Sequence, residues 1–159
     1  MIPTTLRRGL LLAALLPFAA IAHDDATLDK MKTPNGGQLR MAGAYHFELV
    51  LDRSSKEPRD NAVLLYLTDH GDAKLPSAGT KATVTLLGSG TKATASLQPD
   101  GGNRLKGMAR YAATADLKAV VSFTAADGKN EQARFTPFAA IPAAASPAPA
   151  AGGGGHRHH

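Results

Sequence analysis

The chain has 159 residues, no cysteine, and a formal net charge of +5 from 18 Lys and Arg against 13 Asp and Glu. The absence of cysteine excludes disulfides, thiolate metal sites and cysteine nucleophiles, so any metal must bind through imidazole, carboxylate, amine or thioether groups. Lysines and arginines are scattered singly, which is typical of a solvated surface and excludes the clustered basic face that nucleic-acid binding needs.

Residues 1–22 have the three parts of a cleavable secretory signal peptide. A pair of arginines is followed by an apolar run over residues 9–20 and by an Ala-Ile-Ala signal-peptidase site that ends at Ala22. The apolar run is too short for a membrane span, which needs roughly 20 residues. We therefore expect export to the periplasm, a mature chain that begins at His23, and no membrane span after cleavage.

Residues 23–137 are predicted to form one domain of short β-strands. The run YHFELVLD alternates apolar and polar side chains, which is typical of a half-buried strand, and NAVLLYLTD is apolar enough for a central strand. Turn signals rich in Gly, Pro, Asn and Asp separate these from further short runs. The eight predicted strands cover residues 37–42, 45–52, 61–69, 81–87, 92–98, 104–110, 117–125 and 131–137. A helical turn is expected only within residues 24–31 or 113–119.

This regular spacing predicts an all-β fold, a single antiparallel β-sandwich of immunoglobulin-like type with seven or eight short strands. A small closed barrel is the alternative. From residue 138 the composition changes to Ala and Pro, then Gly, then His. This segment lacks the large apolar side chains that would offset the entropy cost of ordering. We therefore expect residues 138–159 to be a disordered tail ending in a His cluster.

No enzyme motif is present. The chain has no nucleophile elbow, zinc-protease motif, phosphate-binding loop or dinucleotide-binding turn. The four glycines at 152–155 lie in the expected tail, with no strand before them. We therefore expect a protein that is not an enzyme. The residues most able to bind a ligand are the six histidines, all of which lie outside the signal peptide.

The predicted mature chain has histidines at both of its ends. As a mature N-terminus, His23 offers an α-amine with a reference pKa of roughly 7.7–8.0 and an imidazole, which together can close a chelate ring on Cu(II). His156, His158 and His159 follow a glycine hinge, and short His-rich tracts bind Ni, Cu or Zn without a fixed geometry. The alternatives are a terminal histidine placed by chance and, at the other end, the remnant of an expression tag.

Two further candidate sites lie within the predicted domain. His46 and Glu48 share one face of a strand, where same-face side chains are about 7 Å apart, so an ion could bind between them with a third ligand. The alternative is a solvent-facing pair. His70 lies in an Asp-His-Gly-Asp turn at the end of a strand, and the alternative there is an Asx-type turn with an exposed histidine. Because rim loops gather at the ends of a sandwich, His70 is expected near His23.

Several runs carry a resemblance to known proteins. They are TPNGGQLRMAGAYHFELVL, LLYLTDHGDAKLPSAG, LQPDGGNRLKG and AVVSF…ARFTPF, and together they cover about residues 33–137. They resemble small exported proteins of proteobacteria and periplasmic segments of heavy-metal efflux adaptor subunits, with His46 and Glu48 matching the strand pattern. In such relatives a histidine often precedes the Gly-Gly pair, where this chain has Asn35. The resemblance implies metal handling in the cell envelope, with an efflux adaptor as a possible partner.

A looser resemblance is to copper-resistance proteins and polysaccharide monooxygenases, which bind copper through a mature N-terminal histidine. The chain has no Trp and only three Tyr, too few for a glycan-binding face. We expect a periplasmic protein that binds copper or another divalent ion and buffers it or delivers it to efflux, as a heavy-metal resistance accessory. Two alternatives stay open, an envelope interaction module on an efflux complex and a copper oxidase. The candidate metal ligands are His23, His46, Glu48, His70, His156, His158 and His159.

Overall fold

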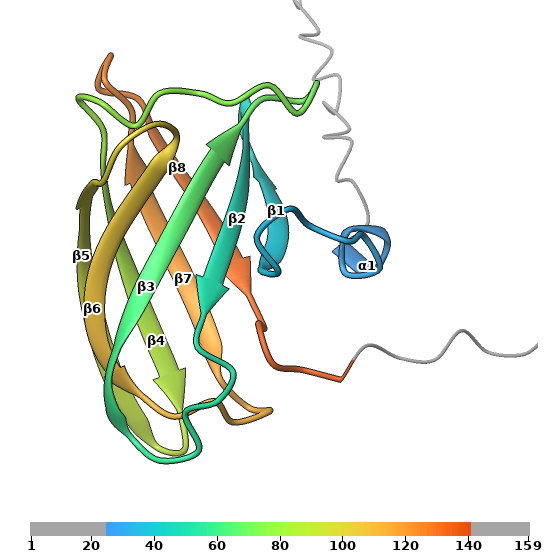
Figure 1. Cartoon of the computed structure of the whole chain (residues 1–159), viewed down its shortest axis with the longest axis vertical. Coiled ribbons are helices and arrows are strands. Elements are labelled where there is room, and N and C mark those ends of the chain that lie inside the picture. The colour runs from blue at the N-terminus through green and yellow to red at the C-terminus, as the bar shows by residue number, and fades with distance from the viewer. Residues whose placement is uncertain (1–24, 141–159) are drawn as a thin grey trace, which may run out of the picture.

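The computed structural model describes residues 25–140 of the chain (Figure 1). They form one antiparallel sheet of eight strands, nearly closed into a barrel, in the order β1-β2-β3-β6-β5-β4-β7-β8. The elements are α1 (Asp25–Leu28), β1 (Gln38–Ala42), β2 (Tyr45–Leu51), β3 (Arg59–Thr68), β4 (Lys81–Gly88), β5 (Thr91–Pro99), β6 (Arg104–Tyr111), β7 (Lys118–Thr124) and β8 (Asn130–Phe135).

The predicted all-β class is confirmed, and each of the eight predicted runs contains a strand. The helical turn expected within residues 24–31 is α1, whereas residues 113–119 contain a turn and the start of β7. These local features follow from side-chain alternation and turn residues, which act within a few positions of the chain.

The strands form one continuous sheet in place of the predicted immunoglobulin-like sandwich, and this sheet is nearly closed into a barrel, which is nearer to the alternative, a small closed barrel. Two four-stranded halves, β1-β2-β3-β6 and β5-β4-β7-β8, are joined by a short ladder that pairs Gln98 with Lys106 and Pro99 with Leu105. This ladder makes the sheet continuous. The spacing of strands along the chain does not determine whether β5 pairs with β6. The sequence pattern therefore could not distinguish a sandwich of two sheets from a barrel made of one sheet.

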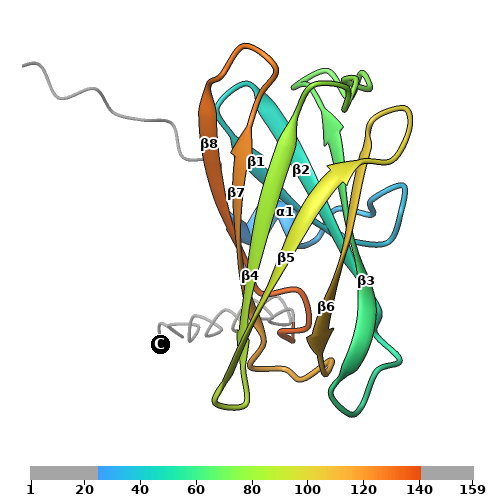
Figure 2. The same cartoon turned by 90° about the vertical axis from the view of Figure 1, so that its left-hand side faces the viewer.

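The two halves of the sheet face each other (Figure 2), and the buried core side chains come from both of them. Phe47 and Leu49 of β2 and Leu65 of β3 are fully buried, as alternation on these strands predicts. The ring centroid of Phe47 lies 5.1 Å from that of Phe123 on β7. Because these two strands belong to opposite halves, this contact ties the halves together.

The strands β1 and β8 are the two ends of the sheet, and they face each other across a seam. Side chains bridge the seam: the side-chain oxygen of Gln38 accepts a 2.8 Å hydrogen bond from the backbone of Thr136, and the Arg40 guanidinium lies 5.9 Å from the Phe135 ring. Asp29, just after α1, accepts 2.7 Å hydrogen bonds from both Gln38 and Arg40. The α1 segment therefore covers one side of the seam, beside β1 (Figure 1).

A strap, defined here as residues 31–37, connects α1 with β1 and is fixed to the outer face of β2. The anchor is Glu48, whose carboxylate accepts hydrogen bonds from the backbone N–H of Asn35 (2.9 Å), its side-chain amide (2.8 Å) and the backbone N–H of Gly37 (2.9 Å). The strap therefore covers an outward-facing part of the sheet that would otherwise meet solvent.

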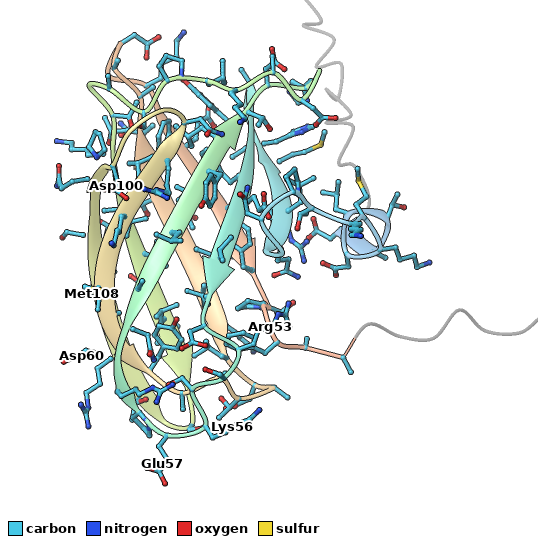
Figure 3. All side chains as sticks on the ribbon, viewed as in Figure 1. Arg53, Lys56, Glu57, Asp60, Asp100 and Met108 are labelled. Carbon is cyan, nitrogen blue, oxygen red and sulfur yellow. The ribbon has the colours of Figure 1, made fainter. Side chains whose placement is uncertain are left out.

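The ordered packing reaches beyond the last strand. Phe138, the first residue of the predicted tail, packs against the core, and the Arg53 guanidinium lies 5.5 Å from its ring (Figure 3). The predicted signal peptide and the tail from residue 141 lie outside the described residues. Among residues 25–140, the helical content does not include a segment with the length and hydrophobicity of a membrane span.

Candidate functional site

His46 lies on the outward face of β2, yet it is only 7% exposed. Neither ring nitrogen has a hydrogen-bond partner among the described residues. A buried imidazole without partners is unusual, since burying an unpaired polar group costs free energy. The His70 ring covers it, with the two ring centroids 4.9 Å apart and the planes almost perpendicular at 85°. The structure thus brings together two of the predicted site residues.

The turn after β3 places His70 and Asp72 on the same side of the barrel as His46. Asp69 holds this turn, because its Oδ1 accepts hydrogen bonds from the backbone N–H of Gly71 (2.8 Å) and Ala73 (2.9 Å). This is the Asx-type turn weighed from the sequence. Asp72 adopts a positive φ of 62°, and its Oδ1 lies 3.6 Å from Nδ1 of His46.

The orientation of His70 is set by a second contact. Its Nε2 lies 3.1 Å from the carbonyl oxygen of Gly43 in the β1–β2 hairpin. A carbonyl only accepts, so Nε2 donates this hydrogen bond, and in a neutral imidazole the lone pair is then on Nδ1. Metal-binding histidines are commonly oriented in this way, by donating their other N–H to a backbone carbonyl.

The arrangement of the two rings suits a shared ion. Two imidazoles bound to one ion at a metal–nitrogen distance of about 2.1 Å place their ring centroids roughly 4.5–5.5 Å apart. The His46–His70 separation of 4.9 Å falls in this range, which it shares with ordinary edge-to-face ring contacts, and the exposed carboxylate of Asp72 lies beside His46. Within residues 25–140, however, no three His, Asp or Glu side chains are grouped so as to hold an ion by themselves. A bound ion would therefore take ligands from elsewhere.

Glu48 has a different role from the one expected. It was predicted to share an ion with His46 or to face solvent, but it is 5% exposed and both its oxygens accept hydrogen bonds from the strap. Its cross-strand neighbours are Leu39 and Tyr66. Glu48 therefore anchors the strap, and its carboxylate is committed there.

A cleft of about 290 Å³ lies between the strap and the outer face of the sheet. Met31, Pro34 and Leu39 give it an apolar wall, and Lys74 lines it from the turn after β3. Asp72 lines the cleft as well as approaching His46, so the cleft and the histidine pair adjoin. Its complete lining is Met31, Lys32, Thr33, Pro34, Asn35, Leu39, Glu48, Tyr66, Thr68, Asp72, Lys74 and Asn103.

Sequence reasoning did not find the cleft or the strap, because both depend on a segment without regular secondary structure that folds back over β2. The Thr-Pro-Asn-Gly-Gly run was visible as a turn, but its partner Glu48 is 13 residues from Asn35 along the chain. The remaining predicted ligands, His23, His156, His158 and His159, lie outside the described residues.

Comparisons with known proteins give no relative from which a role could be transferred: no family model, no curated protein and no solved structure matches the chain.

Proposed function

We propose that this chain binds copper or another divalent metal ion in the periplasm, at a site built around His46 and His70, and that it buffers the ion or delivers it to efflux. The observation that carries the proposal is the buried His46 ring, which makes no hydrogen bond through either nitrogen and packs against a second imidazole, with the Asp72 carboxylate 3.6 Å from its Nδ1. Imidazole and carboxylate ligands suit Cu(II), Zn and Ni.

The other ligands of the ion are proposed from the predicted N-terminus. Asp25, the first described residue, is ion-paired with Arg40 at the seam. His23 precedes it by two residues, and its amine and imidazole would supply two nitrogens to the ion. The tail histidines are proposed as weaker, additional ligands.

Titration of Cu(II) into the mature protein tests the proposal, with binding followed by calorimetry and by the visible absorption of the ion. His46→Phe keeps a ring of similar size without its nitrogens, and His70→Ala removes an exposed residue on a turn. Each variant is expected to bind Cu(II) at least tenfold more weakly. Asp127→Asn, at an exposed turn, serves as the matched control and should bind as the wild type does.

The contribution of His23 is tested separately by His23→Ala and by determining the N-terminus of the exported protein. His23→Ala should weaken binding without abolishing it. Wild-type affinity in both His46→Phe and His70→Ala, or no binding tighter than micromolar by any form of the protein, would contradict the proposal.

A further inference from the structure

The cleft beside the histidine pair is a candidate ligand site. Its volume of about 290 Å³ lies near the lower end of the range for small-molecule pockets. It has an apolar wall of Met31, Pro34 and Leu39. Its charged lining is Lys32, Lys74, Glu48 and Asp72, and Asp72 is the residue that also approaches His46. A small molecule with an apolar body and a charged polar end would match this distribution.

A metal ion bound by the histidine pair would need further ligand atoms, and such a molecule could supply them. His46 and His70 supply two nitrogens, and no third His, Asp or Glu among residues 25–140 is grouped with them to hold an ion. Asp72 lies 3.6 Å from Nδ1 of His46 and also lines the cleft. A molecule in the cleft would therefore have its polar end close to an ion bound by the two histidines.

We propose that the cleft binds an α-amino acid with an apolar side chain as a chelate of the metal ion, so that the ion is taken up as a metal–amino acid complex. This inference rests on the proposed metal site. The amine nitrogen and a carboxylate oxygen of the amino acid would occupy two positions on the ion. Lys74 would balance the carboxylate, and the side chain would lie against Leu39 and Met31.

The same two positions are those proposed for the amine and imidazole of His23. The free amino acid and the N-terminus therefore compete for these two positions. When the amino acid leaves, the amine and imidazole of His23 would replace it, and all ligands of the ion would then come from the protein. This competition predicts that an amino acid has its largest effect in the His23→Ala protein.

The test titrates preformed 1:1 complexes of Cu(II) with L-leucine and with glycine into the His23→Ala protein. Both amino acids chelate Cu(II) through the same two atoms, but glycine has no side chain to enter the cleft. The leucine complex is expected to bind about tenfold more tightly, from partial burial of its side chain. Met31→Ala, which removes part of the apolar wall, should reduce this preference, and Lys74→Gln should weaken both complexes alike, whereas Lys81→Gln, on the exposed start of β4, should change neither.

The outcomes separate this inference from the proposed function. If Cu(II) binds and depends on His46 and His70, but the leucine and glycine complexes bind equally well, the cleft inference is overturned and metal binding stands. Equal effects of Lys74→Gln and Lys81→Gln would also overturn it. If Cu(II) binds in no form, the metal site fails first and the cleft inference fails with it.

Discussion

The buried carboxylate of Glu48 has no cation beside it in the hydrogen-bond network of the strap. Three N–H groups satisfy it, two from Asn35 and one from Gly37. Hydrogen bonds to a charged acceptor are stronger than neutral ones, and a buried donor left without a partner is costly. The position of the strap, and with it one wall of the cleft, therefore depends on a single side chain.

Glu48→Gln is expected to destabilise the protein by about 1–3 kcal/mol, because the amide replaces a charged acceptor and turns an N–H group toward the N–H donors of the strap. Urea denaturation at neutral pH measures this change. Asn35→Ala removes only the side-chain donor, keeps both backbone donors, and should cost less. A Glu48→Gln protein as stable as the wild type would contradict this role for the carboxylate.

Asp29 links stability to pH at the seam. Burial raises its pKa, but hydrogen bonds from Arg40 and Gln38, together with the charge of Arg40, outweigh burial and hold the pKa of Asp29 below its usual value of 3.8. A carboxyl with a lowered folded-state pKa contributes stability that is fully present above its unfolded pKa. This contribution is lost as pH falls through the folded pKa.

Asp29→Asn should therefore be less stable than the wild type at about pH 6, and the difference should shrink as pH falls below about 4. Chemical denaturation at several pH values measures the two stabilities. In an Arg40→Gln background most of the pH-dependent difference should disappear, because the cation that lowers the pKa is gone. A difference that stays constant down to about pH 2 would contradict this linkage.

At the scale of single elements, Gly107 permits the change of direction between the two halves of the sheet. It lies on β6, next to the short ladder that joins β5 and β6. A Cβ at this position would overlap the backbone oxygen of Ser96 and lie 2.6 Å from the side chain of Leu97. Both obstacles belong to β5, so the two strands cross closely only because this residue has no side chain.

Gly107→Ala is expected to destabilise the barrel by about 1–3 kcal/mol, as overpacking does. The control is Gly71→Ala, where a Cβ would meet its nearest neighbour, Asp69, at an ordinary 3.4 Å and should change stability by less than about 0.5 kcal/mol. Thermal and urea unfolding of both variants give the comparison. Similar stabilities for the two would show that β5 can move away from β6 without cost.

The strands were predictable because their signals are local. Alternation on β2 identifies Phe47 and Leu49 as core residues, and both are fully buried. The same alternation assigns His46 and Glu48 to the outer face, which is correct, but it leaves them exposed, which is wrong. Their burial comes from the turn after β3 and from the strap, which are brought over β2 by tertiary contacts. The contact between His46 and His70 is likewise a result of the fold, which the alternation on β2 does not predict.

At the scale of the whole molecule, side chains bridge the gap in the nearly closed barrel, and no eighth ladder joins β1 to β8 among the described residues. The ends of the sheet, β1 and β8, contact each other through Gln38, Thr136, Arg40 and Phe135. Exposed sheet edges are prone to pair with other chains, and natural proteins commonly cover them. Here α1 and its ion pair with Arg40 provide a cover on the side of β1.

Hydrogen exchange should distinguish this seam from the continuous part of the sheet. The strands β3 and β4 each have two paired neighbours, whereas β1 and β8 each have one. Local opening requires less free energy where fewer backbone ladders must break. Amides of β1 and β8 are therefore expected to exchange faster than those of β3 and β4 under native conditions.

Arg40→Gln should lower protection further in β1 and β8 while leaving β3 and β4 unchanged, because Arg40, 5% exposed, joins α1 to the seam and stacks on Phe135. Arg59→Gln is the matched control, since its ion pair with Asp52 is largely exposed and contributes little. If Arg40→Gln lowered protection equally in all strands, the seam would not open as a separate unit. The barrel would then unfold as one cooperative structure, and α1 would stabilise the whole sheet and not its edge.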